Sequence, residues 1–210
     1  MKLLLLGATG LVGRTTLGLA LRNDAFSEVI APTRKPLAPS DRLVNPVGPR
    51  LEAFFPSLMA DKPDSVICAL GTTRAKAGSK EAFRHVDHGL PLALGKAAHA
   101  AGVETFAIVT ALGASPHSMS FYYRTKGEVE RDIRAIGFRS LTICRPSLIG
   151  GDRHETRAAE AAALALLGFL APVLPRKFQV NPAEVIAASL LDAIIASKTG
   201  ECRISSEELA

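Results

Sequence analysis

The chain has little aromatic surface: it contains no tryptophan and only two tyrosines among 210 residues. Proteins that bind single-stranded nucleic acid commonly stack bases on such rings. The formal net charge is +5, but the basic residues are scattered and form no single stripe of the kind that binds nucleic acid. We therefore expect no nucleic-acid partner and interpret the positive charge as a dispersed, solvated surface.

Cysteine is scarce as well. Cys68, Cys144 and Cys202 are widely spaced, form no CxxC motif and have no histidine at metal-ligand spacing. This pattern predicts free thiols, no metal centre and a reducing, cytoplasmic location. Cys68 and Cys144 lie near the ends of predicted strands, so we expect both thiols to be packed rather than nucleophilic.

Long hydrophobic runs are also missing. The longest, 161–174, is shorter than the ~20 residues of a membrane-spanning helix and is interrupted by Gly168 and Pro172. The opening run 3–6 ends at Gly7 without the length or cleavage pattern of a signal peptide. We therefore expect no membrane partner. The sequence also lacks a GxSxG segment, which argues against a serine hydrolase.

The chain does contain short apolar runs that alternate with longer amphipathic stretches. This alternation is typical of a parallel sheet with helices on both faces, so we predict an α/β fold with a doubly wound parallel sheet. The expected strands are 2–6, 28–33, 43–47, 65–70, 104–110 and 140–145, and the expected helices between them are 11–22, 79–101 and 118–136. In the second helix, one apolar stripe is expected to pack on the sheet: Phe83, Val86, Leu90, Ala93, Ala97 and Ala101.

The pattern changes after Gly150-Gly151. An alanine- and leucine-rich helix, a proline-rich turn, a helix over 182–197 and a short strand near 202–204 are expected there. We interpret residues 154–210 as a small C-terminal substrate-side cap of the same domain as residues 1–153. The apolar stretch 161–174 would be a wall of the substrate site or a subunit interface, so a monomer and a homodimer both remain open.

A glycine-rich segment follows the first predicted strand and opens the first predicted helix. It reads Gly7-Ala8-Thr9-Gly10-Leu11-Val12-Gly13. In this order the glycines let the backbone approach a pyrophosphate, and the helix supplies free N–H groups and a positive dipole. We predict dinucleotide binding by Gly7, Thr9, Gly10, Leu11, Val12 and Gly13; the alternative is a plain tight turn, as in flavodoxin-like domains.

The end of the second predicted strand indicates which dinucleotide is preferred. NAD sites usually carry Asp or Glu there to bind the ribose 2′-hydroxyl, whereas this chain has Thr33-Arg34-Lys35. Cations bind a 2′-phosphate through charge-assisted hydrogen bonds, so the pattern favours NADP(H); the alternative is a solvated basic turn. The adenosine half is expected against the small residues and backbone after the fourth strand: Ala69, Leu70, Gly71 and Thr72.

Tyr122 and Lys126 are four residues apart, so on a helix they share one face. The face continues with Val129, Ile133 and Ile136 and is expected to point into the protein, whereas Tyr123, Gly127, Glu130 and Arg134 are expected to face solvent. A nearby ammonium favours the ionised form of a phenol, which suits Tyr122 for proton exchange with a carbonyl or carbinol oxygen. The alternative is an amphipathic tyrosine beside a snorkelling lysine.

Thr110 ends the fifth predicted strand, at the sheet edge where open α/β sheets bind ligands. Its hydroxyl is the expected donor to a substrate oxygen, with Ser115 as the rival. The segment Arg145-Pro146-Ser147 follows the sixth strand and is expected to pass the nicotinamide, although an ordinary strand-exit turn would read the same. His85, Asp87 and His88 are expected on a solvated helix face rather than at a metal.

Four segments together resemble the atypical short-chain dehydrogenase/reductase family, and within it the Tat-interacting-protein oxidoreductase-like branch. They are Cys68-Ala69-Leu70-Gly71-Thr72-Thr73-Arg74-Ala75-Lys76-Ala77-Gly78, Val86-Asp87-His88, Lys126-Gly127-Glu128-Val129-Glu130, and Arg145-Pro146 through Asp152-Arg153. The resemblance implies that residues 1–153 form a Rossmann domain that binds NADP(H). It also implies a reactive set of Ser or Thr, Tyr and Lys. Similar proteins commonly carry serine where this chain has Thr110-Ala111.

These inferences lead to one preferred function and two alternatives. We expect an NADP(H)-dependent oxidoreductase that acts on a small carbonyl, alcohol or sugar-like substrate through Thr110, Tyr122 and Lys126. The resemblance also implies that some members are NADPH-bound regulators, so an NADP(H) sensor without turnover is the first alternative. A nucleotide-sugar epimerase-like enzyme is the second.

Overall fold

The computed structural model describes residues 1–150 and 175–210. Its strands are β1 (Lys2–Leu6), β2 (Glu28–Ile30), β3 (Leu43–Val44), β4 (Ser65–Cys68), β5 (Thr105–Val109), β6 (Ser140–Arg145), β7 (Ile149–Gly150), β8 (Asn181–Pro182) and β9 (Gly200–Ser205). Its helices are α1 (Leu11–Ala20), α2 (Phe55–Ala60), α3 (Arg74–Ala77), α4 (Lys80–Arg84), α5 (Leu90–Ala100), α6 (Phe121–Arg134) and α8 (Ala183–Ala196), with single turns η1 (Leu51–Phe54), η2 (His85–Gly89) and η3 (Arg176–Phe178). The helix predicted within 161–174 and the boundary predicted at 153–154 lie outside the described residues.

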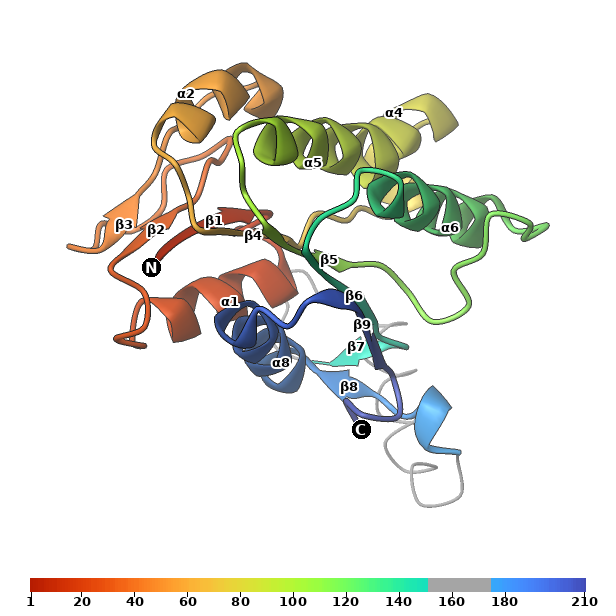
Figure 1. Ribbon diagram of the computed structural model, residues 1–210. Coiled ribbons are helices and arrows are strands. Elements are labelled where there is room, and N and C mark those ends of the chain that lie inside the picture. Colours follow the sequence, from red (N-terminus) through yellow and green to blue (C-terminus); the bar gives the residue numbers. More distant parts are fainter. Residues whose placement is uncertain (151–174) are drawn as a thin grey trace.

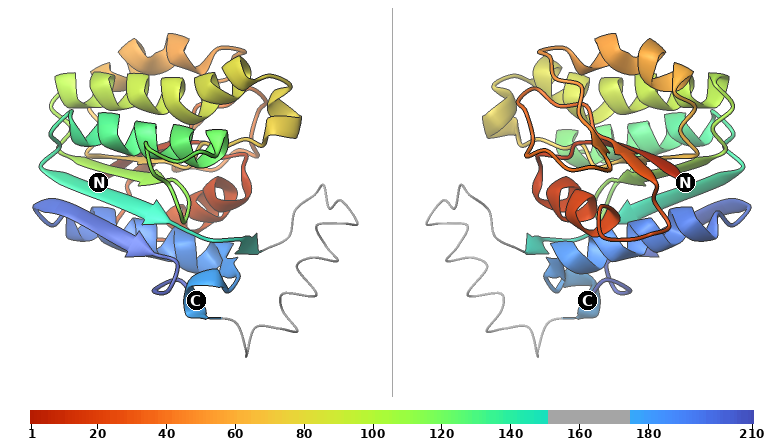
Figure 2. Two further views of the ribbon diagram at one scale, coloured as in Figure 1. Left: turned by 90° about the vertical axis from the view of Figure 1, so that its right-hand side faces the viewer. Right: turned by 90° about the vertical axis from the view of Figure 1, so that its left-hand side faces the viewer.

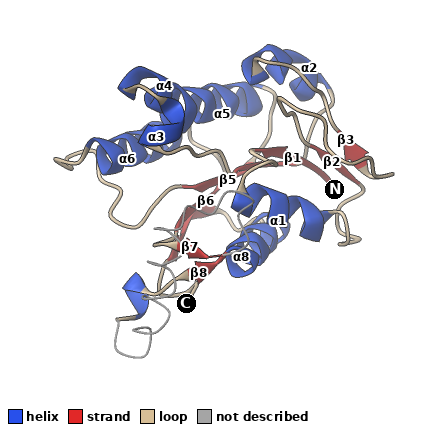
Figure 3. Ribbon diagram, turned by 180° about the vertical axis from the view of Figure 1, so that it is seen from behind, coloured by secondary structure: helices blue, strands red, loops and turns tan. Residues whose placement is uncertain are grey.

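Seven strands form one sheet in the order β3-β2-β1-β4-β5-β6-β9, and each neighbouring pair is parallel. Helices α2, α4, α5 and α6 cover one face of the sheet, and α1 and α8 cover the other (Figure 1, Figure 2). The predicted α/β fold with a doubly wound parallel sheet is therefore confirmed. Strands β7 and β8 pair separately, at the end of the molecule that also holds the C-terminus (Figure 3).

The C-terminal part adds one helix and one strand to these layers. Strand β9 pairs with β6 over six residues, and α8 packs beside α1. Part of the segment that the sequence assigned to a cap thus belongs to the sheet and one of its helix layers. None of the described helices combines the length and the apolar character that crossing a bilayer requires.

The core consists of two apolar layers, one on each face of the sheet. Along β1, Leu4 and Leu6 belong to the layer under α2, α5 and α6, whereas Leu3 and Leu5 belong to the layer under α1 and α8. All four leucines are fully buried, and burying such a side chain contributes roughly 1.5–3 kcal/mol. A strand covered on both faces is apolar at every position rather than at alternate ones, which explains the unbroken run at the start of the chain.

Helix α2 was not among the predicted elements. Leu51 is followed, at steps of four, three and one residues, by the buried residues of this helix, Phe55, Leu58 and Met59. Pro56 lies in the first turn of the helix, where proline is favoured. The apolar spacing that indicates a helix is thus present in the sequence, but the helix spans only six residues. The predicted strand 28–33 ends early, at Ile30, although Thr33 still bridges to Val47.

The helix predicted over 79–101 is interrupted by a π-helical turn, η2. Before this turn Phe83 is buried as expected. From this turn onward Leu90 is buried as predicted, but Asp87, Leu94 and Ala98 are buried where the sequence predicted Val86, Ala93 and Ala97. The π turn contains one extra residue, and one residue rotates an α-helix by about 100°, which explains the shift.

Candidate active site

The phosphate loop has the strand, turn and helix in the predicted order. Gly7 has a φ of +99°, and a Cβ atom there would lie 2.6 Å from the carbonyl carbon of Ala69, so only glycine fits. The Gly10 amide donates to the Gly7 carbonyl oxygen at 3.0 Å. Within the described part of the chain no side chain caps the start of α1, and the first turn of this helix contains no acidic residue. The first-turn N–H groups therefore face a space suited to an anion.

Gly13 allows α1 to pack tightly against this loop. A Cβ atom at this position would lie 2.0 Å from the Gly7 carbonyl oxygen, and that oxygen belongs to the rigid backbone of the loop. Gly18 lies on the same helix, but a Cβ atom there would meet only the end of the Arg22 side chain, at 3.8 Å. The two glycines of α1 therefore have opposite tolerance for a methyl group.

We expect Gly13→Ala to destabilise the protein by ~1–3 kcal/mol, because the added methyl group overpacks the contact between α1 and the loop. Gly18→Ala is expected to stabilise it by roughly 0.5–1 kcal/mol, because alanine loses less conformational entropy in a helix. Equilibrium unfolding in urea measures both changes. Equal stability of Gly13→Ala and the wild type would contradict the close contact.

A cavity of about 200 Å³ extends from this loop to the end of β2. Five predicted cofactor residues line it: Gly7, Thr9, Thr33, Arg34 and Leu70. The remaining lining residues are Ala8, Pro32, Pro49, Arg50, Leu51, Glu52, His85, Val86 and Leu90. The cavity thus combines the phosphate loop with apolar walls and two guanidinium groups, from Arg34 and Arg50.

The basic end of β2 is only partly as predicted. Arg34 is exposed and lines the cavity, whereas Lys35 is exposed but does not line it. Thr33 is buried, and its hydroxyl donates to the Lys35 carbonyl oxygen at 2.7 Å, which fixes the turn. Sequence reasoning missed Arg50, because it reaches the cavity only through the path of the chain after β3.

Tyr122 and Lys126 lie on α6 with the predicted inward face. Val129 and Ile133 continue that face and are fully buried, and Tyr123 is 40% exposed, as expected. The Tyr122 ring packs against Phe83, with a centroid distance of 5.8 Å. The Lys126 ammonium is buried, and its Nζ atom lies 2.8 Å from Oδ1 of Asp87.

The electrostatics of this pair differ from the expectation. Burial raises the pKa of the Tyr122 phenol and Asp87 adds to this increase, whereas the positive charge of Lys126 offsets it only in part. Burial on its own would lower the pKa of Lys126, but Asp87, Tyr122 and Cys68 raise it above the usual lysine value. Tyr122 therefore holds its proton more firmly than an exposed tyrosine, and Lys126 remains charged inside the protein.

Asp87 is the main residue that sequence reasoning misplaced. The sequence predicted a solvated helix face, yet the Asp87 side chain has no exposed surface. Oδ2 accepts a hydrogen bond from the Thr72 amide at 2.9 Å, and Oδ1 faces Lys126. His88 is also drawn inward, with its Nε2 atom 2.8 Å from Oδ2 of Asp132. The π turn at η2 rotates both residues, and no local pattern announced it.

Thr110 is buried just beyond β5, but its hydroxyl points to a carboxylate. It donates to Oε1 of Glu130 at 2.6 Å and lies 3.3 Å from the Cys144 carbonyl oxygen. A threonine hydroxyl has one proton to donate, so Thr110 has none left for a substrate oxygen. Within 1–150 and 175–210, the Ser115 hydroxyl is recorded only as an acceptor, from the His117 amide at 3.3 Å.

The solvent face predicted for Gly127 and Glu130 is wrong. Glu130 is fully buried and also accepts from Arg145, with Nε at 2.8 Å, and from Arg134 at 3.4 Å. A Cβ atom at Gly127 would lie 2.1 Å from the carbonyl carbon of Ser115. The loop between β5 and α6 folds back over this side of the helix, which the periodicity of α6 alone does not reveal.

The segment after β6 is held by the C-terminal part of the chain. The Ser147 amide donates to Oδ1 of Asn181 at 2.8 Å, and the Ser147 hydroxyl donates to the Gln179 carbonyl oxygen. The Pro146 carbonyl oxygen accepts from the Leu112 amide at 2.8 Å. The side chains of Arg145 and Ser147, the Ser147 amide and the Pro146 carbonyl oxygen thus all bond within the protein.

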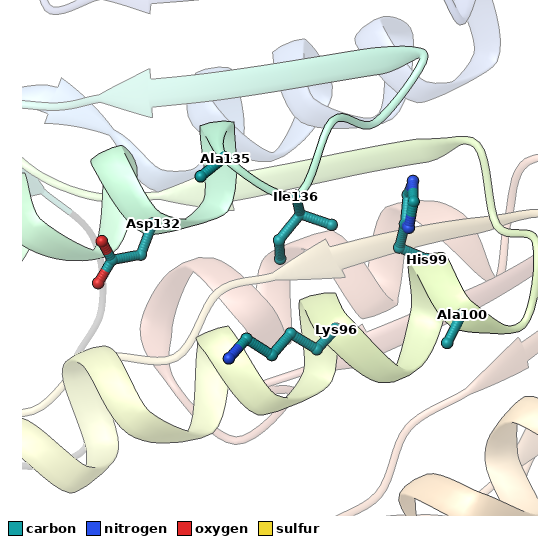
Figure 4. A pocket seen from close by; sticks show the side chains of 6 residues that line it. All are labelled: Lys96, His99, Ala100, Asp132, Ala135 and Ile136. Carbon is teal, nitrogen blue, oxygen red and sulfur yellow. The ribbon is translucent and has the colours of Figure 1, made fainter.

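A second hollow, of about 330 Å³, lies between α5 and α6. Figure 4 shows the side chains that line it: Lys96, His99, Ala100, Asp132, Ala135 and Ile136. Among the residues that the structure describes, it shares none with the cavity at the phosphate loop. Its one carboxylate, Asp132, already pairs with His88 and Arg131, and we assign this hollow no role.

The prediction for Cys68 and Cys144 is confirmed. Both thiols are free and buried. Burial raises the pKa of Cys68 to about 11 and that of Cys144 to about 12. Because the thiolate is the nucleophile, neither side chain is poised to react.

No protein-family model matches the chain. Its fold is shared by the Bordetella bronchiseptica enzyme WbmH in complex with NAD+, with a TM-score of 0.74, 15% identity and coverage of 98% of this chain and 75% of that chain. UDP-glucose 4-epimerase from Thermotoga maritima gives a TM-score of 0.72 at 15% identity, with coverage of 98% and 77%. At this identity the likeness shows the Rossmann-type fold.

Curated relatives are more similar in sequence. "Protein fmp52, mitochondrial" from Aspergillus clavatus is 34% identical over 98% of this chain and 92% of its own length. The protein of that name from Debaryomyces hansenii is 35% identical over 87% of this chain and 81% of its own length. The word mitochondrial in these names contradicts the predicted cytoplasmic location. Free cysteines report a reducing environment and do not identify the compartment. The extent of identity shows that the chain belongs to the Fmp52 family.

Proposed function

We propose that this protein is an oxidoreductase of the short-chain dehydrogenase type that uses NADP(H). The observation that carries the proposal is the inward-facing pair Tyr122 and Lys126, which lies beside the loops at the carboxyl edge of the sheet where the phosphate loop also lies. Solved structures of the same fold contain NAD+ or NAD. The segment 68–78 favours membership of the Tat-interacting-protein oxidoreductase-like branch. The names of the relatives favour a mitochondrial location.

The residues of the cavity fit a dinucleotide. The uncapped start of α1 and the glycines of the loop suit a pyrophosphate, and the walls formed by Pro32, Leu70 and Val86 suit an adenine ring. Arg34 and Arg50 are the two cations of the lining, and they suit a ribose 2′-phosphate. Glu52 also lines the cavity and is positioned to accept from a hydroxyl or amino group.

When bound, the nicotinamide supplies or accepts a hydride. Tyr122, whose pKa is raised by burial, would hold a proton for the oxygen of a small carbonyl substrate. Lys126 would bind the ribose and balance the charge that develops on the phenol. Because the Thr110 proton is held by Glu130, we propose Ser115 as the hydroxyl that orients the substrate oxygen. The expected partner is thus a small molecule, bound by a monomer or a homodimer.

Two alternatives share the same cofactor site. The deep burial of Lys126 would also suit an NADP(H) sensor in which the Tyr–Lys pair only binds ribose. The fold shared with UDP-glucose 4-epimerase would suit an epimerase-like reaction. Turnover of a carbonyl substrate with net oxidation of NADPH separates the proposed function from both.

The first experiment is the shift in melting temperature with NADPH and with NADH at matched concentrations. A ligand that binds only the folded state stabilises it by ~2.7 kcal/mol at a hundredfold excess over Kd. We expect a clear shift with NADPH and a small one with NADH. No shift with either dinucleotide would contradict the proposed function.

Arg34→Glu is expected to remove most of the NADPH shift and preserve the NADH shift, because the new carboxylate repels the 2′-phosphate. The loss of charge-assisted hydrogen bonds corresponds to about 1.5–3 kcal/mol, or roughly 10- to 100-fold in Kd. Arg22→Glu is the matched control, because Arg22 is exposed and lies outside the cavity. A parallel loss in both variants would indicate a general charge effect.

A further inference from the structure

A single buried carboxylate connects two parts of the proposed site. Asp87 accepts a hydrogen bond from the Thr72 amide, in the loop after β4, and its other oxygen lies 2.8 Å from the Lys126 ammonium on α6. The Lys126 side chain is only 6% exposed, and that of Asp87 is not exposed at all. The carboxylate thus joins the backbone of the loop at Gly71 and Thr72 to the lysine of the reactive pair.

The π turn at η2 makes this arrangement possible. His85 and Val86 line the cofactor cavity, and the next residue, Asp87, turns to the interior of the protein. A Cβ atom at Gly71 would lie 3.8 Å both from Oδ1 of Asp87 and from Nζ of Lys126. The ion pair therefore lies directly under the loop that the sequence assigns to the adenosine half of the cofactor.

Burial makes the two charges depend on each other. A buried ammonium without a partner loses its proton readily, because the charged form is poorly solvated. Removing one member of a buried pair leaves the other charge uncompensated. The titratable groups that act on Lys126 are Asp87 from η2, Tyr122 from α6 and Cys68 from β4. Asp87 is the carboxyl group among them.

We propose that Asp87 is a positioning residue that keeps Lys126 protonated and holds it against the loop at Gly71 and Thr72. The inference rests on the proposed function for its meaning in catalysis, but the ion pair itself can be tested without turnover. It assigns the broken helix a purpose: the extra residue of the π turn delivers a carboxylate to the reactive lysine while its neighbours face the cavity.

The experiment is a pH titration of the lysine side chains of the full chain by NMR, with the Lys126 signal assigned by its absence in Lys126→Met. In the wild type, Lys126 is expected to keep its proton to a higher pH than the exposed lysines. In Asp87→Asn, the midpoint of the Lys126 titration is expected to fall by at least about one pH unit. The asparagine oxygen can accept the Thr72 hydrogen bond, so the variant keeps this contact and the shape of the side chain but removes the negative charge and the acceptor that face Lys126.

Glu128→Gln is the matched control. Glu128 is also a carboxylate that joins α6 to the broken helix, through an ion pair with Arg84, but it does not contact Lys126. Its replacement is expected to leave the Lys126 titration unchanged. An unchanged titration in Asp87→Asn would overturn the proposal. If that variant does not fold, the wild-type titration still tests the proposal. A Lys126 that loses its proton at a lower pH than the exposed lysines would overturn it as well.

NADPH affinity measured against pH in the same variants separates the two proposals. If Lys126 is the ribose ligand, the affinity of the protein for NADPH is expected to fall once Lys126 loses its proton. This fall is expected at a lower pH in Asp87→Asn than in the wild type. A wild type that binds no NADPH, with the Lys126 titration still dependent on Asp87, would reject the proposed function and support the role of Asp87 in the ion pair. Normal NADPH binding by the wild type, together with a Lys126 titration that does not depend on Asp87, would support the proposed function and reject the role of Asp87.

Discussion

Tyr122→Phe is expected to lower the turnover of a carbonyl substrate with NADPH by at least ~10²-fold, which is the lower range of what a positioned general acid contributes. The variant removes the hydroxyl and keeps the ring, so the packing against Phe83 remains. Cofactor binding is expected to stay nearly constant, because the cavity at the phosphate loop does not include Tyr122. Steady-state kinetics and NADPH titration measure the two effects separately.

The pH dependence of this reaction follows from the direction of the Tyr122 pKa shift. Because burial raises that pKa, the phenol remains protonated to a higher pH than an ordinary tyrosine. Carbonyl reduction needs the protonated form and is expected to persist into the alkaline range, falling only as the pH passes the raised pKa. Alcohol oxidation needs the ionised form and is expected to rise over the same range.

Tyr123→Phe is the matched control for this prediction. Tyr123 is the neighbouring residue on α6, but it is 40% exposed and packs over Gly113 rather than into the helix layer. Loss of its hydroxyl is expected to leave turnover within about twofold of the wild type, as a surface substitution usually does. Equal losses in both variants, or none in Tyr122→Phe, would remove Tyr122 from the reactive set.

Glu130→Ala is expected to destabilise the protein by about 3–5 kcal/mol, the usual result of removing one member of a buried ion pair. For a chain of this size, this corresponds to a fall in melting temperature of roughly 6–20 °C. The variant leaves the Arg145 guanidinium without its carboxylate and the Thr110 hydroxyl with only the longer contact to the Cys144 carbonyl oxygen. Thermal unfolding and urea unfolding measure the change.

The consequence reaches beyond stability. Glu130 connects α6 to Thr110, just beyond β5, and to Arg145, the last residue of β6. These residues precede the two loops that flank the reactive pair. We therefore expect weakened cofactor binding in Glu130→Ala even below its melting temperature.

Glu128→Ala is the control. It removes a more exposed ion pair two residues away and is expected to lower the free energy of unfolding by only ~0.2–1 kcal/mol. Similar losses in both variants would contradict the assigned importance of Glu130.

The sequence by itself determined the elements whose signal is local. An unbroken apolar run at 3–6 indicates a strand covered on both faces, and the glycines that follow indicate a turn into a helix. The spacing of Tyr122, Lys126, Val129 and Ile133 indicates one buried helix face, and the structure confirms it. Each of these inferences uses only neighbours within a few residues, and the backbone geometry of strands and helices fixes such relations.

The tertiary structure decided which polar groups are buried and what they bind. Asp87 and Glu130 look like surface residues in the sequence, because a charged side chain is normally solvated. Asp87 and Glu130 are buried because segments far along the chain supply partners, such as Lys126 for Asp87 and Arg145 for Glu130. Local periodicity does not contain these partners. A buried charge is tolerated only where the fold brings a compensating one to it, and that encounter is a property of the folded chain as a whole.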